Sequence, residues 1–337
     1  MSKAEALNRL SFPPTAGYID IRAPVPNIHR DRKMIKSVLI TGANAGLGRE
    51  CAKQLAEYQQ INKIYLGCRN LHKAKETQAK LVSETGRNIF EVLLIDVADQ
   101  QAVKEAVKNL DSPVDALVMN AGGTGGKEFY NKTPEGVTQI FAVNLLGHAL
   151  LTNELLKANK LTQTAIYAGS EAARGVKEMG MKRPELKSAS VEEFMQICEG
   201  KLYASTKDAT VPYGPIKYMG ALWMSSMARE VPHIRFVTMS PGATVGTEGF
   251  NTLSLFKQYM MKGMMRIMLL LGKVHKVEIG AKRYIDALLD TTSFRTGIFY
   301  GSERGLTGPL GEQWKLFPDL DNPTYQDNAK TAINRFI

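Results

Sequence analysis

From residue 37 onward, short apolar runs alternate with longer amphipathic stretches, and this alternation constrains the fold more than any other feature of the sequence. Runs such as SVLIT, VLLID and DALVM are nearly continuously apolar, as expected for parallel strands that are buried on both faces of a sheet. The stretches between them carry apolar residues at helical spacing, for example Val103, Val107 and Leu110. The pattern predicts an α/β fold, a doubly wound (Rossmann) parallel sheet with helices on both faces.

About seven strands are predicted, and most of them are followed by a helix. The strands are expected at residues 37–41, 63–68, 90–95, 115–119, 164–168, 234–239 and 297–300, and helices at 46–58, 71–84, 99–110 and 137–156. A chain of 337 residues can hold two domains, but an α/β fold often runs past ~250 residues around a single sheet. We therefore expect residues 37–337 to form one domain.

Three segments lie outside the repeating pattern. Residues 1–36 contain Pro13, Pro14, Pro24 and Pro26, which disfavour a helix and predict an extended N-terminal extension. Residues 171–212 are polar and irregular, and we expect an insertion there that shapes access to the site or covers a surface. Residues 251–277 are rich in methionine and leucine and are predicted to form a helical substrate lid, with ordinary core packing and a peripheral membrane contact as alternatives.

The charge and the cysteines narrow the range of partners. The sequence has 43 basic and 33 acidic residues, which gives a net charge of +10. Such a charge suits binding to nucleic acid, to an anionic membrane surface or to a phosphorylated cofactor. Zinc-finger spacing and RNA-binding signatures are absent from the sequence, so no nucleic-acid partner is expected. Cys51, Cys68 and Cys198 are odd in number and lack C-x-x-C spacing, which argues against disulfides and a metal site. We expect a cytoplasmic protein, while the N-terminal extension leaves organelle targeting open.

A glycine-rich turn with the spacing G-x-x-x-G-x-G follows the first predicted strand and opens the first helix. Glycines permit a tight turn and let the backbone approach a pyrophosphate, whose charge is favoured by the free N–H groups of the helix start. An ordinary glycine-rich turn is the alternative interpretation. The residues expected to bind the cofactor here are Gly42, Asn44, Ala45, Gly46, Leu47 and Gly48.

The end of the second strand indicates which dinucleotide binds. An acid there would accept the 2′-hydroxyl of NAD and repel the 2′-phosphate of NADP, but the sequence has Gly67-Cys68-Arg69. Arg69 can hold that phosphate with paired, charge-assisted hydrogen bonds, so NADP(H) is the predicted cofactor. Asp96, with Val97 beside it after the third strand, is placed to accept a hydrogen bond from the adenine amine, and a helix cap is its alternative role.

Further motifs follow in a fixed order. Asn120-Ala121-Gly122 comes after the fourth strand, Asn144 lies in the next helix, Ser170 ends the fifth strand, and Tyr213 and Lys217 are spaced Y-x-x-x-K. Together with T-G-x-x-x-G-x-G, this ordered set resembles the short-chain dehydrogenase/reductase family from about Ser37 to Gly301. The segments LGCRNLHKAKE and VNLLGHALLT are similar to the retinol dehydrogenase and protochlorophyllide reductase branch in particular.

The resemblance implies roles for individual residues. Asn144 matches the asparagine that holds a water of the proton relay, and Ser170 matches the serine that hydrogen-bonds the substrate oxygen. Tyr213 and Lys217 match the acid/base pair, which also contacts the cofactor. The cofactor is further expected to lie against Asn120, Ala121, Gly122, Pro241, Gly242 and Thr244.

The chemistry of the tyrosine also follows from the residues alone. A phenol with a pKa of ~10 is a poor base at neutral pH, so a nearby cation must stabilise the phenolate. Lys217 lies one helical turn after Tyr213, and Pro212 and Pro215 require the tyrosine to sit in the first turn of its helix. Tyr203 and Lys207 have the same spacing, but Pro212 interrupts the segment after them, so we favour Tyr213.

These inferences combine into one functional prediction. The chain is expected to be an NADP(H)-dependent oxidoreductase that moves a hydride to or from a carbonyl or alcohol of a bulky apolar substrate. A light-dependent protochlorophyllide-type reductase and a non-catalytic NADP(H)-binding sensor are the alternatives. The insertion is expected to cover the helix by which many family members dimerise, which favours a monomer.

Overall fold

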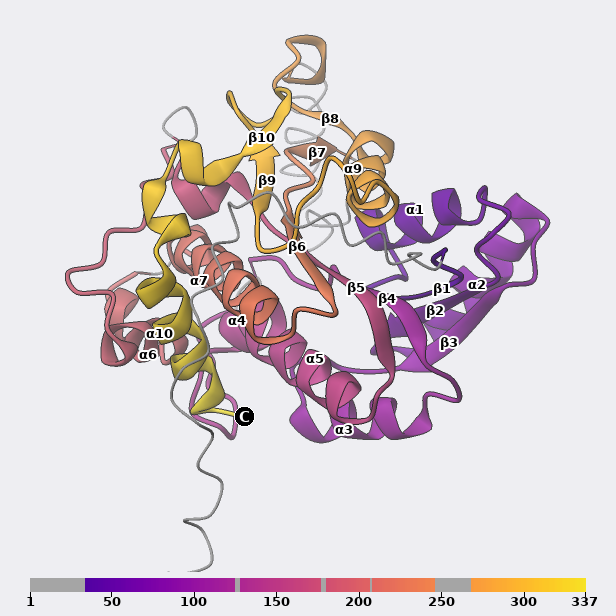
Figure 1. Ribbon diagram of the computed structural model, residues 1–337, viewed down its shortest axis with the longest axis horizontal. Coiled ribbons are helices and arrows are strands. Elements are labelled where there is room, and N and C mark those ends of the chain that lie inside the picture. The colour runs from indigo at the N-terminus through magenta and orange to yellow at the C-terminus, as the bar shows by residue number, and fades with distance from the viewer. Residues whose placement is uncertain (1–33, 125–127, 177–179, 207, 246–267) are drawn as a thin grey trace, which may run out of the picture. The chain divides into compact units, whose positions relative to one another are not determined.

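A computed structural model describes residues 34–124, 128–176, 180–206, 208–245 and 268–337. Its main feature is an eight-stranded sheet with the strand order β10-β9-β6-β5-β4-β1-β2-β3 (Figure 1). All neighbouring strands pair in parallel except β10, which is antiparallel to β9. The strands are β1 Ser37–Thr41, β2 Lys63–Cys68, β3 Phe90–Leu94, β4 Val114–Met119, β5 Leu161–Ala168, β6 Arg235–Met239, β9 Phe299–Ser302 and β10 Leu310–Glu312.

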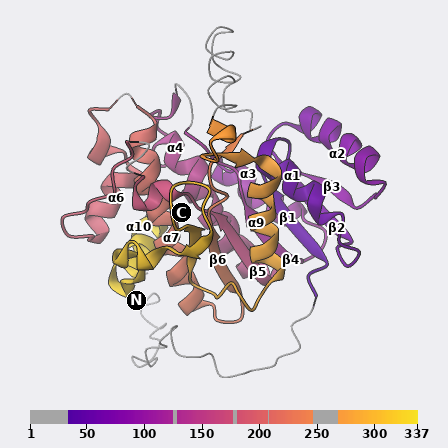
Figure 2. The ribbon, with the colours of Figure 1, turned by 90° about the horizontal axis from the view of Figure 1, so that it is seen from above.

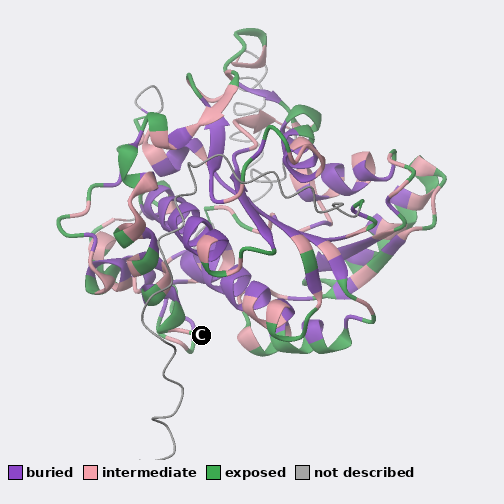
Figure 3. Ribbon diagram, in the orientation of Figure 1, coloured by how far each residue is buried: buried purple, intermediate pink, exposed green. Residues whose placement is uncertain are grey.

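Helices cover both faces of the sheet, as Figure 2 shows from above. One face packs against α1 Gly46–Leu55, α2 Leu71–Thr85 and α9 Val277–Leu289. The other face packs against α3 Gln100–Asn109, α5 Gly147–Lys157 and α7 Thr210–Glu230. The apolar runs of the central strands are almost entirely buried between these layers (Figure 3). The predicted doubly wound α/β fold is confirmed, with seven parallel strands and the unpredicted antiparallel strand β10 at the edge.

The helix predicted over residues 137–156 is divided into three segments. These are α4 Gln139–Phe141, a π-helical turn over Ala142–Leu146, and α5. The π turn contains Asn144, and α5 starts at Gly147, which contacts another backbone directly. A Cβ atom at Gly147 would lie 1.6 Å from the carbonyl oxygen of Val97. The close approach explains why glycine occupies this position.

The segment predicted to be an insertion contains short helices between Ser170 and α7. A 3₁₀ turn, Glu171–Arg174, follows Ser170 directly, and α6 Val191–Cys198 and a second 3₁₀ turn, Lys201–Tyr203, come after it. α6 packs against α7 and against the C-terminal helix α10, Pro323–Asn334, which itself lies along α7 (Figure 1). The cover over α7 is therefore built from α10 as well as from the insertion.

Two further predictions concern regions at the limits of the described residues. Residues 1–33 of the predicted extension 1–36 and residues 251–267 of the predicted lid 251–277 lie outside them. The described end of the lid region contains β8 His275–Lys276, which pairs with β7 Thr244–Val245. Among the described helices, none has both the length and the apolar character that crossing a membrane requires.

Candidate active site

The predicted site residues gather at one edge of the sheet. In a parallel sheet the carboxyl ends of the strands all lie on the same side, which is where ligands bind in doubly wound folds. Gly42, Arg69, Asp96, Asn120, Ser170 and Pro241 come within two residues of the ends of β1, β2, β3, β4, β5 and β6, respectively.

The glycine-rich turn has the geometry of an anion cradle. Gly42 and Gly46 have φ values of +66° and +53°, which favour glycine, and a Cβ atom on Gly48 would lie 2.4 Å from the carbonyl oxygen of Gly42. The N-cap residue of α1 is Ala45, which offers no side-chain cap, and the first turn of the helix contains no acidic residue. By contrast, α2 and α3 are capped by the side chains of Asn70 and Asp99. The uncapped start of α1 fits a pyrophosphate, which its free N–H groups would bind.

Thr41 connects this turn to the loop after β4. Its hydroxyl oxygen accepts hydrogen bonds from the backbone N–H groups of Asn120 and Ala121, at 2.9 and 3.0 Å. The Asn120 side chain donates to the carbonyl oxygen of Thr41 at 3.0 Å. Thr41 Oγ1 also lies 2.9 Å from Nε2 of the buried His148. The sequence analysis assigned a cofactor contact to Asn120 and Ala121 but missed Thr41 and His148, which hold them in place.

The adenosine end of the site is more open. Arg69 is exposed beside the turn, and its guanidinium makes no hydrogen bond or ion pair within the described parts of the chain. One carboxylate oxygen of Asp96 accepts a hydrogen bond from the N–H of Ala98 at 2.9 Å. The cap of α3 is Asp99 rather than Asp96, and Val97 is buried beneath the loop. Within the described residues the second oxygen of Asp96 has no hydrogen-bond partner, and it can accept a bond from a ligand amine.

Tyr213 and Ser170 meet at the centre of this edge. Tyr213 is the fourth residue of α7, within its first turn as predicted, and its hydroxyl lies beside the Ser170 side chain. Burial raises the pKa of Tyr213 to about 12, which the neighbouring Ser170 hydroxyl opposes and the negative charge of Glu171 reinforces. The phenol is therefore protonated at neutral pH in the protein alone.

Lys217 lies beneath Tyr213 on the same helix. Its ammonium nitrogen is 5.6 Å from the centre of the Tyr213 ring and donates a hydrogen bond to the carbonyl oxygen of Ala168 at 2.9 Å. The side chain is almost completely buried, and this burial lowers the pKa of Lys217 to about 7. When charged, the amine favours the phenolate form of Tyr213.

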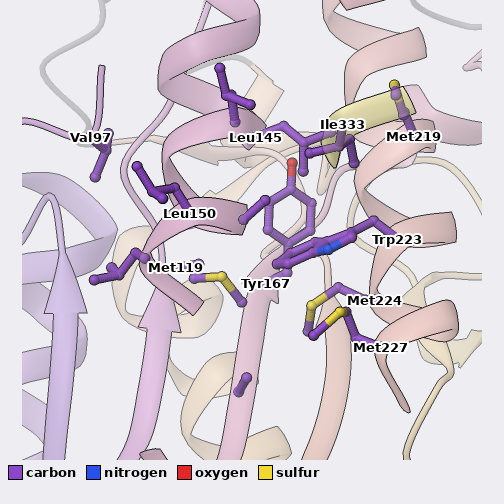
Figure 4. Packing of buried hydrophobic residues seen from close by; sticks show 14 of the residues in the cluster. Val97, Met119, Leu145, Leu150, Tyr167, Met219, Trp223, Met224, Met227 and Ile333 are labelled. Atoms are coloured by element: carbon purple, nitrogen blue, oxygen red, sulfur yellow. The ribbon is translucent and has the colours of Figure 1, made fainter. Parts of the chain in front are cut away.

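Asn144 is fixed by the loop after β4. Its side-chain oxygen accepts from the N–H of Gly123 at 3.0 Å, and its side-chain nitrogen donates to the carbonyl oxygens of Gly123 and Ile140 at 2.7 and 2.8 Å. Its backbone carbonyl oxygen accepts a hydrogen bond from the hydroxyl of Tyr167 at 2.9 Å. Tyr167 is buried between Leu145 and Trp223, in the core that Figure 4 shows. The sequence analysis did not identify Tyr167.

Gly122 brings the lysine and the asparagine together. A Cβ atom at Gly122 would lie 2.5 Å from Oδ1 of Asn144 and 3.7 Å from Nζ of Lys217. The predicted Asn-Ala-Gly loop is thus directly adjacent to both side chains.

The turn after β6 completes the edge. Gly242 has a φ of +73° and lies after Pro241. A Cβ atom on Gly280 of α9 would lie 2.5 Å from Thr244, 2.8 Å from Leu47 and 3.1 Å from the carbonyl oxygen of Pro241. Gly280, which sequence analysis missed, therefore allows this turn to pack against the start of α1.

The alternative tyrosine lies elsewhere. Tyr203 belongs to the 3₁₀ turn Lys201–Tyr203, which packs against α6, and burial raises its pKa, with the charges of Glu193 and Tyr130 adding to the effect. Lys207 lies outside the described residues. Of the two tyrosines, the described geometry places Tyr213 next to Ser170.

Comparison with known proteins gives matches over the N-terminal half of the sheet. The family model for short chain dehydrogenases matches residues 36–174. Human "Retinol dehydrogenase 11" is 35% identical over 133 residues, which are 39% of this chain and 40% of the relative. Human "Retinol dehydrogenase 13" is 31% identical over 145 residues, 42% of this chain and 40% of the relative. The matched part thus spans about two fifths of the length of these curated relatives.

Solved structures resemble the fold over a larger share of the chain. The L-sorbose reductase from Gluconobacter frateurii, complexed with NADPH and L-sorbose, has a TM-score of 0.59 at 17% identity and covers 81% of this chain and 97% of its own. An NADPH-bound carbonyl reductase from chicken fatty liver has a TM-score of 0.53 at 19% identity, with coverages of 82% and 100%. A 3-oxoacyl-[acyl-carrier protein] reductase from Brucella melitensis with bound NAD has a TM-score of 0.53 at 19% identity, with coverages of 79% and 88%.

Proposed function

We propose that the chain is an NADP(H)-dependent oxidoreductase of the short-chain dehydrogenase/reductase family that acts on the carbonyl or alcohol group of a bulky apolar substrate. Residues 36–174 match the family model for short chain dehydrogenases, and retinol dehydrogenases are among the relatives. The observation that carries the proposal is the meeting of Ser170, Tyr213 and Lys217 at the sheet edge where α1 starts without a cap. A module that only binds the cofactor needs the uncapped helix but has no use for an acid/base pair.

In the proposed reaction, each residue of this group has a distinct task. When bound, the nicotinamide cofactor supplies or accepts the hydride. Ser170 and Tyr213 hydrogen-bond the substrate oxygen, and in reduction Tyr213 delivers a proton to it. Lys217 stabilises the phenolate that remains, because its positive charge lies one turn away in a site of low dielectric. Oxidation of an alcohol reverses the proton transfer.

The preference for NADP(H) rests on charge at the adenosine end. Arg69 is exposed and available at the end of β2, and no acid stands there to accept a ribose 2′-hydroxyl. A guanidinium binds a phosphate with two parallel hydrogen bonds. Fold neighbours include NADPH complexes and an NAD complex, so the preference depends on Arg69 and not on the likeness of fold.

The proposal also covers the class of substrate, the cellular compartment and a contact with a membrane. The retinol dehydrogenase relatives and the methionine-rich segment at 251–277 support a bulky apolar substrate such as a retinoid or steroid. Three free, buried cysteines support a reducing compartment, for which we propose the cytoplasm. The net charge of +10 together with exposed Leu270 and Leu271 supports a peripheral contact with a membrane.

The proposal is tested by binding followed by turnover. NADPH and NADH are titrated by fluorescence, and NADPH oxidation is then measured over a panel of apolar carbonyls for the wild type, Tyr213→Phe and Tyr203→Phe. We expect tighter binding of NADPH and loss of turnover in Tyr213→Phe alone. Loss in Tyr203→Phe alone would assign catalysis to the other tyrosine. Binding of NADPH without reduction of any carbonyl would favour a sensor, or a reductase that requires light.

A further inference from the structure

Glu171 is a buried carboxylate that the proposed reaction does not use. It follows Ser170 directly in the chain, and only 2% of its surface is exposed. Its Oε2 atom accepts a hydrogen bond from the hydroxyl of Ser240 at 2.6 Å, and its Oε1 atom accepts from the N–H of Ser302 at 2.9 Å. Glu171 therefore links the turn after β5 to the ends of β6 and β9.

Arg283 of α9 approaches the same carboxylate from the opposite side. Its Nη1 atom lies 3.8 Å from Oε1 of Glu171 and donates to the hydroxyl of Ser302 at 3.1 Å and to the carbonyl oxygen of Ser240 at 3.4 Å. Its Nη2 atom donates to the carbonyl oxygen of Gly308 at 3.0 Å. Glu171 and Arg283 thus share Ser240 and Ser302 as hydrogen-bond partners.

Ser240 connects this ion pair to the turn expected to face the nicotinamide. Its hydroxyl accepts a hydrogen bond from the N–H of Gly242 at 3.1 Å while donating to Glu171. His275 of β8 fixes the middle of the same turn, because its Nε2 atom lies 2.7 Å from the carbonyl oxygen of Pro241. The conformation of Pro241 and Gly242 therefore depends on the hydroxyl of Ser240, which Glu171 holds in place.

A buried ion pair is costly to maintain unless its polar atoms are satisfied, and it seldom stabilises a fold more than apolar residues would. Here both carboxylate oxygens and both terminal guanidinium nitrogens have hydrogen-bond partners, which are Ser240, Ser302 and Gly308. Such a satisfied pair defines one geometry, since any displacement leaves a charge without its partner.

We propose that Glu171, paired with Arg283, is a positioning residue that fixes the Pro241-Gly242 turn relative to Ser170, and so aligns the nicotinamide half of the cofactor with the substrate oxygen. This inference rests on the proposed function for the identity of the cofactor. The adenosine half of the site, built from the ends of β1, β2 and β3, does not contact this ion pair.

The position of Glu171 also carries an electrostatic consequence. The titratable and charged groups around its carboxylate are Arg283 and Tyr284 of α9, His275 of β8 and Tyr213 of α7. The negative charge raises the pKa of Tyr213. Neutralising Glu171 should therefore shift the tyrosine-dependent limb of the pH–rate profile to lower pH, a change that loss of packing alone would not produce.

The test compares Glu171→Gln with Glu193→Gln as a matched control. Glu193 is also buried and accepts hydrogen bonds from the backbone N–H groups of Lys187, Ser188 and Ala189, but it lies in α6 and its partners precede that helix. Each variant is titrated with NADPH and with adenosine 2′,5′-bisphosphate, which is the adenosine half of that cofactor. Ser240→Ala is the second variant, because it removes the connection to Gly242 without leaving a buried charge unpaired.

We expect Glu171→Gln and Ser240→Ala to weaken NADPH binding by about tenfold and to change binding of the bisphosphate less than about twofold. Glu193→Gln should change neither. Equal weakening of both ligands, or unchanged NADPH affinity in a folded variant, would overturn the proposal. If the wild type binds NADPH but reduces no carbonyl, the proposed function fails, whereas the comparison of the two ligands still decides the role of Glu171.

Discussion

The hydroxyl of Tyr213 lies beside the side chain of Ser170, although residues 171–212 separate the two in the sequence. The intervening chain leaves the sheet edge as a 3₁₀ turn, forms α6 and returns to the start of α7. The return is close, because a Cβ atom on Gly214 would lie 2.8 Å from the carbonyl oxygen of Ala172. The insertion can therefore vary without separating the two hydroxyl groups.

Replacement of Lys217 should change how stability depends on pH. Burial lowers the pKa of this amine to about 7, so between pH 7 and pH 9 the unfolded chain binds a proton that the folded protein does not. The free energy of unfolding of the cofactor-free protein should thus rise with pH by about 1 kcal/mol per unit from this group. Urea unfolding at pH 7, 8 and 9 measures the slope.

Lys217→Met should remove most of that slope, and Lys104→Met, which changes an exposed lysine of α3, should retain it. A slope that survives in Lys217→Met would show that this amine is not the group that titrates. The raised pKa values of Cys51 and Cys68, at about 12 and 11, act in the opposite direction above about pH 8, where the unfolded thiols begin to lose their protons. This contribution is the same in all three proteins, so the difference between the slopes of Lys217→Met and Lys104→Met isolates the amine.

Reversal of charge at Arg69 should change the cofactor preference. In Arg69→Glu, the carboxylate repels a 2′-phosphate and can accept a ribose 2′-hydroxyl, so NADPH should bind about 10- to 100-fold more weakly while NADH binds at least as well as before. Fluorescence titration with both nucleotides measures the ratio of affinities. Lys80→Glu, at an exposed position further along α2, makes the same change in net charge and should leave the ratio unaltered. An unaltered ratio in Arg69→Glu would place the 2′-phosphate elsewhere.

The fold was largely predictable because parallel strands buried on both faces leave a clear pattern. β1 and β2 have the predicted bounds, and the others differ by a few residues. β10 and α10 escaped prediction, since β10 has only three residues and α10 has few apolar ones. The predicted site residues were found through short motifs. Thr41, His148, Glu171 and Arg283 were missed because their roles arise from contacts between distant segments, for example 112 positions apart for the ion pair, Glu171 and Arg283.

Gly147 should tolerate no side chain. A Cβ atom would lie 1.6 Å from a backbone oxygen of Val97, and neither backbone can move without displacing α5 or the loop after β3. Gly147→Ala should reduce stability by about 3 kcal/mol or more, which lowers the Tm by roughly 5 °C or more. Gly86→Ala is the control: nothing lies within 4 Å of its Cβ position, and only its φ of +68° is unfavourable. Gly86→Ala should lose about 1 kcal/mol of stability. Equal losses of stability in Gly147→Ala and Gly86→Ala would contradict the steric explanation.

The covering of α7 should keep the protein monomeric. From Gly214 to Ala228, every residue of α7 is buried within the single chain, partly by α10 and α6. A helix covered in this way offers no apolar face to a second copy. Sedimentation equilibrium of the full chain should give the mass of one chain at micromolar concentration.

Removal of the cover over α7 should change the oligomeric state of the protein. Ala329 and Ile333 of α10 are completely buried, so Ala329→Glu with Ile333→Glu should detach α10 and expose the apolar surface of α7. We expect this variant to self-associate, whereas Thr331→Glu with Asn334→Glu, at exposed positions of the same helix, should remain a monomer. A stable dimer of the wild type would contradict the prediction, because its interface would have to lie on a surface other than α7.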